Sequence, residues 1–448
     1  MKLIKSSNIH SISCGNSSMV CYNTLLNLPI LLDKESYSYL MNIKEVDAQN
    51  NRYSEEEKIF IEALKDSFLL LEEGKNENLI CEELNNIYLS KLSAGQTIHF
   101  LDLRISEKCN FGCKHCISSG AQSNEVMTGE FAIGIVDHVV QFLSERNDNF
   151  SHIDLHYGNA EPLMNFGVIK TVQEHFSKHY PHINKATSIN TNLSLLTEEI
   201  ADFLIKEDIA VYVSLDGTKE ANDSIRIFKG GKGTFDVIWK KIKLLRKRGN
   251  GLGGISVTLT DKNFPYFDLS FIDWCVENGF HGLAMDFDLV NSLSISIDER
   301  VDFLTSMWKK CNKLNIEFFG TWITPFLNIS NRSITDRHYA FCKGVQGKSL
   351  SVAPNGLFYL CGSSSTPLGH YKEIGSSFRK GGLAYDLVSS RLIGKNEMCK
   401  GCIIEGSCAG QCHVTNEYST DNKRKLCDYY RTVTERLLSI QGASDSNL

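Results

Sequence analysis

Three cysteines on one short segment have the spacing of a metal-cluster loop. They follow the pattern C-x3-C-x2-C as Cys109, Cys113 and Cys116. Thiolates this close together can bind three corners of a 4Fe–4S cluster, which leaves its fourth iron without a protein ligand. An iron with an open position can bind a small molecule, as a catalytic metal does. The alternative is a structural zinc loop with a distant fourth ligand, although such sites favour paired C-x2-C units.

A second group of cysteines lies closer to the C-terminus. Its pattern is C-x13-G-x4-C, then C-x2-C-x5-C-x3-C, then one last cysteine, and its members are Cys342, Cys361, Cys399, Cys402, Cys408, Cys412 and Cys427. Seven thiolates nearly satisfy two four-ligand clusters. The alternative is a pair of zinc ribbons, for which His413 could supply an eighth ligand. We expect the other cysteines to be buried or incidental thiols: Cys14, Cys21, Cys81, Cys275 and Cys311.

The first cysteine group follows the first strand of a region in which strands and helices alternate. We predict strands at Ile98–Ile105, His152–Tyr157, Ala186–Thr191, Ala210–Leu215, Gly254–Leu259 and Leu283–Leu289. The helices between them are predicted at Glu130–Arg146, Ile169–His179, Thr197–Ile205, Phe235–Arg248, Phe264–Asn278 and Ile297–Leu314. Six βα units in series imply an α/β fold with a parallel sheet and right-handed crossovers. Since eight units close a full barrel, we expect a partial barrel with its functional loops after the strands.

The regions on either side of this barrel have different patterns. Residues 1–90 read as a small α+β unit with a capping box at Ser54 and Glu57, and we expect a winged-helix-like module. The barrel is expected at 97–313, a bridging region at 314–341, the cysteine-rich domain at 342–430 and a C-terminal tail at 431–448. The cysteine-rich domain has short segments and frequent turns, so bound metal would supply stability that its core lacks.

The composition is that of an ordinary globular chain. Its 448 residues are 42% hydrophobic and carry a net charge of −6, which argues against nucleic acid as the main partner. No apolar run approaches the roughly 18 residues that a membrane helix needs. The N-terminal residues lack the apolar stretch of a secretory signal, so we expect a cytoplasmic protein with reduced thiols.

Residues at the ends of the next strands complete a resemblance to a known family. Glu161-Pro162 follows the second strand, Asn190-Thr191-Asn192-Leu193 ends the third, and Ser214-Leu215-Asp216-Gly217 ends the fourth, with Arg226 downstream. In order, and after C-x3-C-x2-C, these segments resemble the radical S-adenosylmethionine (radical SAM) enzymes. The resemblance implies that the open iron binds SAM, which is cleaved to a 5′-deoxyadenosyl radical that abstracts a hydrogen atom from the substrate.

The same resemblance implies which residues contact SAM. Gly158, Asn159 and Glu161 lie in a segment similar to the GGEP loop that cradles the SAM amino group. Asn159 and Ala160 stand where two glycines are usual, and Leu193 replaces the glycine of a TNG segment. Ser214 and Arg226 would contact the SAM carboxylate, a task that suits the guanidinium fork.

The second cysteine group resembles the SPASM domain, which binds two auxiliary 4Fe–4S clusters. The resemblance implies that Cys399, Cys402, Cys408 and Cys427 hold one cluster completely. Cys342, Cys361 and Cys412 would hold the other, for a total of three clusters. Many relatives supply a further cysteine just before the position of Cys342, but residues 331–341 contain none. We therefore expect an open iron there that could bind a substrate thiolate.

The expected function is the maturation of a ribosomally made peptide. The N-terminal unit resembles modules that bind the leader of a precursor peptide at a sheet edge; the alternative is a fragment that only packs on the barrel. The expected product is a thioether, as in sactipeptide and ranthipeptide maturases, with flavodoxin or ferredoxin as electron donor. The alternatives are carbon–carbon crosslinking, sulfatase-type oxidation, or a non-catalytic iron–sulfur electron carrier. The sequence identifies no general base.

Overall fold

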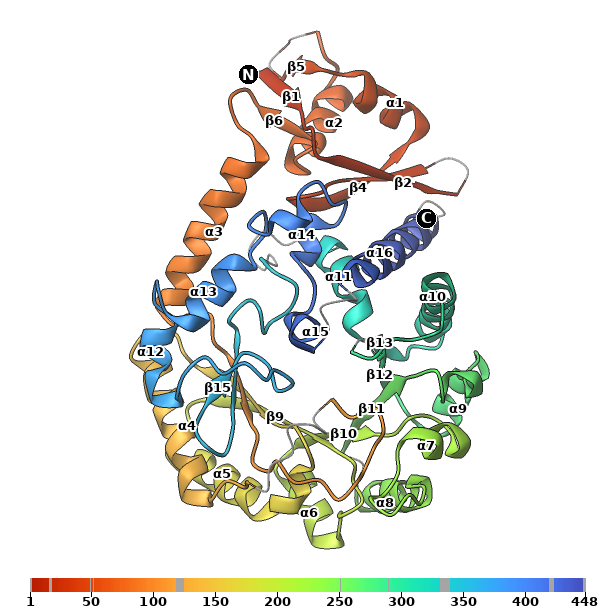
Figure 1. Ribbon diagram of the computed structural model, residues 1–448. Coiled ribbons are helices and arrows are strands. Elements are labelled where there is room, and N and C mark those ends of the chain that lie inside the picture. The colour runs from red at the N-terminus through yellow and green to blue at the C-terminus, as the bar shows by residue number, and fades with distance from the viewer. Residues whose placement is uncertain are drawn as a thin grey trace.

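The computed structural model describes residues 2–15, 18–48, 50, 52–117, 125–249, 251–288, 290–330, 339–418 and 423–445. Its largest element is a nine-stranded sheet with the order β13-β12-β11-β10-β9-β8-β7-β14-β15. In Figure 1 this sheet curves around an interior, with its helices on the outside. The predicted α/β fold with a parallel sheet is confirmed.

Six parallel strands in chain order form the middle of the sheet. They are β7 (Phe100–Leu103), β8 (His152–Tyr157), β9 (Asn184–Thr191), β10 (Ile209–Ser214), β11 (Leu252–Leu259) and β12 (Gly282–Phe287). The outer helices are α4 (Gly129–Ser144), α5 (Phe166–His179), α6 (Glu198–Lys206), α8 (Phe235–Arg248), α9 (Ser270–Glu277) and α10 (Ile297–Lys313). Each predicted strand and helix of this region has a counterpart, with ends that differ by a few residues. At the helix predicted for Phe264–Asn278, the structure has the short 3₁₀ turn η2 (Phe264–Tyr266) and then, separately, α9.

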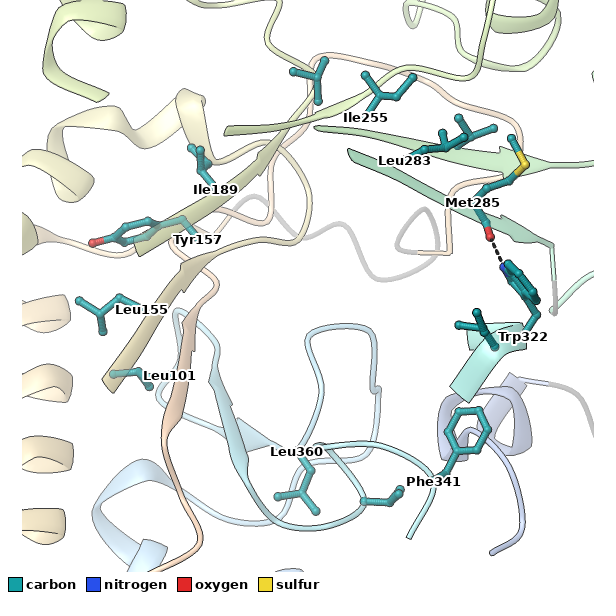
Figure 2. Packing of buried hydrophobic residues seen from close by; sticks show 14 of the residues in the cluster. Leu101, Leu155, Tyr157, Ile189, Ile255, Leu283, Met285, Trp322, Phe341 and Leu360 are labelled. Atoms are coloured by element: carbon teal, nitrogen blue, oxygen red, sulfur yellow. Dashed lines mark hydrogen bonds between the residues drawn. The ribbon is translucent and has the colours of Figure 1, made fainter. Parts of the chain in front are cut away.

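The two faces of these strands differ in polarity. In β10, Ile209, Val211 and Val213 are buried, whereas the residues between them are partly exposed. Figure 2 shows buried hydrophobic side chains of successive strands, among them Leu155 and Ile189, directed away from the barrel interior. Alternate side chains of a strand point to opposite faces, so the polar residues between the hydrophobic ones line the interior. These are the residues that can surround a ligand.

The sheet extends beyond the six predicted strands at both edges. β13 (Glu317–Phe319) adds in parallel to β12, and β14 (Ser349–Val352) adds in parallel to β7. β15 (Phe358–Tyr359) then pairs antiparallel with β14. The cysteine-rich region is therefore built onto the barrel sheet. β14 escaped prediction because its sequence, SLSV, is short and half serine.

The N-terminal region contains two small sheets. One three-stranded antiparallel sheet has the order β5-β1-β6 and the other the order β2-β3-β4. The elements are β1 (Lys2–Lys5), β2 (Ile9–Cys14), β3 (Ser18–Asn23), β4 (Asn27–Asp33), α1 (Lys34–Asn42), β5 (Glu45–Asp47), α2 (Glu55–Asp66), β6 (Leu70–Glu72) and α3 (Glu77–Ser93). The capping box of Ser54 and Glu57 is present at the start of α2. The winged-helix-like assignment stays a prediction.

The chain after the barrel is mainly helical. It contains η3 (Thr321–Ile323), α11 (Thr324–Ser330), η4 (Tyr371–Glu373), α12 (Ile374–Ser377), α13 (Leu383–Ser390), η5 (Glu397–Cys399), α14 (Glu405–Cys408), α15 (His413–Tyr418) and α16 (Lys423–Asp445). The described part of the expected tail, residues 431–445, belongs to α16, and Val433, Leu437 and Leu438 on this part of the helix are buried. Among the described helices, none has the length and apolarity needed to cross a membrane.

The N-terminal module is joined to the cysteine-rich region by direct backbone contacts. The turn between β3 and β4 meets α14, where Gly406 N donates to Thr24 O at 2.7 Å. Asn27 Nδ2 donates to Gly406 O at 3.2 Å. At the other end of the same sheet, Ser439 Oγ of α16 donates to Ser13 O at 2.8 Å. The module is thus fixed to the segment between Cys402 and Cys408.

Candidate functional site

A cavity of about 500 Å³ lies at the carboxyl ends of the barrel strands. Cys109, Cys113 and Cys116 line one part of it, and Cys361 and Cys412 line another. Ligands of parallel α/β sheets bind at this edge. The two predicted cysteine groups therefore open onto one shared space.

The loop of the first cysteine group is held by the segment that follows α7 (Lys219–Ile225). Gly112 N donates to Ile227 O at 2.8 Å, and Lys114 N donates to Ile225 O at 3.0 Å. The backbones approach so closely that a Cβ on Gly112 would lie 3.2 Å from Lys229 Cα. This packing keeps the three sulfurs at the cavity wall.

Two side chains from other strand ends reach the sulfurs of this loop. Asn192 Nδ2 donates to Cys109 Sγ at 3.8 Å, and Arg226 Nη1 donates to Cys113 Sγ at 3.8 Å. Burial raises the pKa of Cys113 to about 11, whereas the Arg226 guanidinium opposes that rise. A bound metal would deprotonate these thiols, and donors at the sulfurs would then stabilise the thiolates.

The donor set of this loop fits an iron–sulfur cluster. Among the described residues, no three His, Cys, Asp or Glu side chains are arranged to hold one metal ion. In an iron–sulfur cluster each cysteine binds a different iron, so the sulfurs need not converge on one point. The donor set, three thiols and no carboxylate, also matches the preference of such clusters.

An ion pair fixes Arg226 in the cavity wall. Arg226 Nε lies 2.8 Å from Asp216 Oδ2, and Asp216 is completely buried. The second oxygen, Asp216 Oδ1, accepts a hydrogen bond from Thr258 N at 2.8 Å. Asp216 therefore positions the guanidinium from the end of β10. Ser214, also predicted to contact SAM, lines the same cavity.

Glu161 holds two loops together. Its Oε1 accepts hydrogen bonds from Leu163 N at 3.0 Å and from Thr191 Oγ1 at 2.6 Å, and its Oε2 accepts one from Asn192 N at 2.7 Å. Burial raises the pKa of Glu161 to about 7, and these hydrogen bonds oppose the rise. The cavity lining includes Asn159 but neither Gly158 nor Glu161. The geometry gives Glu161 a positioning role, and its contact with the cofactor stays a prediction.

The loop before Glu161 keeps the conformation that glycine would adopt. Asn159 and Ala160 have φ angles of 62° and 27°, and Leu193 in the neighbouring loop has 61°. L-residues with side chains are disfavoured there, although asparagine tolerates this region better than most. Asn159 and Ala160 both line the cavity, so the departure from two glycines leaves the path of the backbone intact.

Neighbouring thiols in the second cysteine group influence one another's pKa values. Burial raises the pKa of Cys412 to about 12, and the neighbouring Cys342 and Cys361 add to the rise. Burial also raises the pKa of Cys408, and here the neighbouring Cys399, Cys427 and Cys402 add to the rise. The assignment of these thiols to two separate clusters stays a prediction.

Two arginines that the sequence did not single out lie close to these thiols. Arg104, just after β7, donates from Nη2 to Cys361 O at 2.8 Å and from Nε to Ser351 Oγ at 2.9 Å. Arg391 Nη2 donates to Gly410 O at 2.6 Å. Burial lowers the pKa of Arg391, and nearby thiols of both expected sets oppose that change. His413, the candidate zinc ligand, is buried, with its Nε2 3.9 Å from Glu417 Oε1.

Asp286 and Thr321 are cavity residues that sequence reasoning missed. Asp286 is the next-to-last residue of β12, and its Oδ1 accepts hydrogen bonds from Thr321 N and Thr321 Oγ1, both at 2.7 Å. Its inward position in the alternation of β12 was the available signal, because Leu283, Met285 and Phe287 are the hydrophobic residues around it. Thr321 carries no such signal, since it lies 35 residues further along the chain.

Comparisons with known proteins agree with this architecture. Residues 103–264 match the model of the radical SAM superfamily. The chain is 24% identical to the radical SAM cyclopropyl synthase TigE of Paramaledivibacter caminithermalis, over 98% of this chain and 96% of that protein.

Two solved structures share the fold. SuiB of Streptococcus suis, bound to its precursor peptide SuiA, is 16% identical, has a TM-score of 0.57 and covers 94% of this chain and 98% of its own. Native anSMEcpe with bound AdoMet is 18% identical, has a TM-score of 0.62 and covers 78% of this chain and 99% of its own. The match over 103–264 leads to one conclusion: this region is a radical SAM domain, and the chain that contains it is an enzyme.

Proposed function

We propose that this radical SAM enzyme modifies a ribosomally made precursor peptide. The observation that carries the proposal is the single cavity that both cysteine groups line. A radical SAM domain implies a 4Fe–4S cluster and SAM, which together supply a carbon radical that takes a hydrogen atom from a substrate. Cys109, Cys113 and Cys116 would hold that cluster. A peptide segment in the cavity would lie between this cluster and Cys361 and Cys412.

The relatives support a peptide as the substrate class. The structure of SuiB is that of an enzyme bound to a precursor peptide, and its similarity extends over nearly the whole chain. The match covers 94% of this chain, and the part it leaves out is shorter than residues 1–90. The matched region therefore includes at least part of the N-terminal module. We propose that residues 1–90 bind the leader of the precursor, and that a flavodoxin or ferredoxin supplies the electron for SAM cleavage.

We further propose two auxiliary clusters in a SPASM-type domain. Cys399, Cys402, Cys408 and Cys427 would bind one, and the three thiols of Cys342, Cys361 and Cys412 would bind the other. Three thiolates leave one iron of the second cluster without a cysteine. A substrate thiol would lose its proton on binding there, and its sulfur would be fixed next to the radical carbon. This arrangement favours a thioether as the product.

Carbon–carbon bond formation is the second candidate. Its support is the similarity to TigE, a cyclopropyl synthase, over almost the full length of both chains. The two candidates differ in one requirement: a thioether needs a cysteine in the peptide, whereas a carbon–carbon bond does not. Replacing each cysteine of the precursor by Ser therefore distinguishes them.

Iron content and SAM cleavage test the cluster assignment. Anaerobically reconstituted protein is expected to bind about 12 irons, four for each cluster. Changing Cys109, Cys113 and Cys116 together to Ala should remove about four irons and abolish cleavage of SAM. Protein that binds zinc and negligible iron under anaerobic, iron-replete conditions would contradict the proposal.

Mass spectrometry of the precursor peptide tests the function itself. With SAM and a reductant, the peptide should lose two hydrogen atoms, and SAM should be converted to 5′-deoxyadenosine. A fluorescence titration should detect binding of the leader peptide alone. If the enzyme cleaves SAM but leaves every precursor encoded beside it unchanged and unbound, peptide modification is rejected.

A further inference from the structure

Carboxylates are among the side chains that line the cavity. Apart from cysteines, the titratable residues that line it within the described chain are His115, Arg226, Asp286 and Asp288. Closing a new bond between a C–H and an X–H group removes two hydrogens from the peptide. One leaves as an atom to the SAM-derived radical. The other leaves as a proton and an electron, so the cavity needs a proton acceptor.

Three of the four residues are less suited to accept a proton, by charge, by position in the cysteine loop, or because both carboxylate oxygens already accept hydrogen bonds. Arg226 is paired with Asp216. His115 lies between two cluster cysteines in the sequence, with its Nε2 3.7 Å from Asp216 Oδ2. Asp288 closes the turn after β12, where Oδ1 accepts from Val290 N and Asn291 N, and Oδ2 accepts from Asn291 Nδ2. Asp286 is the remaining carboxylate.

Asp286 is held rigidly by the segment that follows β13. Both hydrogen bonds to its Oδ1 come from Thr321, the first residue of η3. η3 can approach the strand because residue 320 is glycine: a Cβ there would lie 2.4 Å from Met285 O. Trp322 fixes the same contact, since its Nε1 donates to Met285 O at 3.0 Å (Figure 2).

We propose that Asp286 is the general base that accepts the X–H proton of the substrate while the new bond forms. The C–H hydrogen would go to the radical that bound SAM supplies, and an oxidised iron–sulfur cluster held by the auxiliary cysteines would supply the acceptor for the remaining electron. The inference rests on the proposed peptide modification. It commits to a substrate group with an ionisable hydrogen, such as a thiol, next to the end of β12.

The surroundings of Asp286 suit this task. Burial raises its pKa to about 6, and the hydrogen bonds from Thr321 oppose that rise. A general base is most effective when its pKa lies near the working pH. The other titratable groups on this side are Tyr429 and Tyr430 of α16, whose own pKa values burial raises, and Arg300 of α10, which lies against Tyr429. Tyr430 Oη donates to Thr321 Oγ1 at 3.4 Å.

The test measures product formation by the reconstituted enzyme between pH 5 and 8. Unaltered protein should gain activity as the pH rises through about 6. Asp286→Asn should lose 10²–10⁴-fold in product rate, lose that rise, and make more 5′-deoxyadenosine for each product formed. Asp302→Asn is the matched control, because Asp302 is exposed and pairs with Arg436 away from the cavity. It should behave as the unaltered enzyme does.

Thr321 provides a second test that does not remove the carboxylate. Thr321→Ala should shift the rise in activity to higher pH, because the carboxylate loses a donor that stabilises its charged form. Thr321→Ser keeps the hydroxyl and should leave the profile in place. Infrared difference spectra should also show a carboxylic acid band in unaltered protein below about pH 6 that Asp286→Asn lacks.

The outcomes separate this inference from the proposed function. Product formation by Asp286→Asn within threefold of the unaltered rate, with the same pH profile, would overturn the role of Asp286 and leave the function standing. An unshifted profile in Thr321→Ala would also overturn it, whether or not Asp286→Asn folds. Unaltered protein that cleaves SAM but never modifies a peptide would instead reject the function.

Discussion

At the scale of single residues, the buried pair of Asp216 and Arg226 is the strongest charge interaction at the cavity. The Arg226 side chain is 11% exposed and that of Asp216 is completely buried. Asp216→Asn would leave a buried guanidinium without its counter-charge, which typically costs about 3–5 kcal/mol. We expect a lower melting temperature and weaker SAM binding, measured by calorimetry and equilibrium dialysis.

An exposed ion pair gives the control for this variant. Asp273 lies 2.6 Å from Lys310 Nζ, and its side chain is 53% exposed. Exposed pairs contribute about 1 kcal/mol or less, so Asp273→Asn should change stability little. Equal losses in the two variants would show that burial of the Asp216 pair is unimportant.

Glu161 makes stability depend on pH with a defined sign. Its pKa is raised to about 7 in the folded protein because the carboxyl group is buried. The folded state therefore binds this proton more tightly than the unfolded chain does, and the contribution is lost as the pH rises from about 4.5 to 7. Glu161→Gln cannot titrate. The melting temperature of unaltered protein minus that of this variant should decrease from pH 5 to pH 7.5; a constant difference would contradict the raised pKa.

At the scale of elements, the loop before Glu161 stores backbone strain. Ala160 has a φ of 27°, a conformation that costs an L-residue about 1–2 kcal/mol. Ala160→Gly should stabilise the protein by about 1 kcal/mol. The gain stays at the lower end of the range because glycine loses more conformational entropy on folding than alanine does. Thermal unfolding measures the change.

Two neighbouring substitutions should have the opposite effect. Gly158→Ala would place a Cβ 2.8 Å from His156 Nε2 and should destabilise the loop. Leu193→Gly also relieves a positive φ, but Leu193 is completely buried, and the cavity left behind costs about 2–5 kcal/mol. Stabilisation by all three substitutions would show that conformation alone governs these loops.

The elements differ in how far the sequence predicts them. The cysteine loop and the six barrel strands are local patterns, because spacing and hydrophobic alternation appear within a few residues of one another. β14 joins β7 across about 250 residues, and the hydrogen bond of Thr321 to Asp286 spans 35. Such pairings depend on how the whole chain folds back, and no local pattern encodes them. The expected separation of the seven later cysteines into two sets comes from the family resemblance, not from their spacing.

At the scale of the whole molecule, the N-terminal module is part of the environment of the cysteine-rich region. A Cβ on Gly406 would lie 2.0 Å from Leu25 O, so the contact requires glycine. Gly406→Ala should displace the module from α14 and weaken the set that contains Cys402 and Cys408. We expect a loss of about four irons, measured by iron assay and electron paramagnetic resonance, with the SAM-binding cluster retained.

Gly167 of α5 provides the control. A Cβ there meets no atom within 4 Å, so Gly167→Ala should keep the full iron content. Unchanged iron in Gly406→Ala would show that the module and the cluster segment are independent. The same contact complicates a truncation experiment. Deleting residues 1–90 would remove the acceptor of Gly406 N and could disturb α14 as well as peptide binding. Point variants within the module therefore test peptide binding more directly.

The contact at Gly406 has a consequence for protein engineering. A designer who wished to redirect this enzyme to another peptide would graft the N-terminal module of a different maturase onto the barrel. Because one backbone hydrogen bond and one from the Asn27 side chain join the β3–β4 turn to α14, a graft of the module alone would bring a turn that does not fit the host α14. The transferable unit is the module together with residues 402–408, and chimaeras built with that boundary should assemble where module-only chimaeras fail.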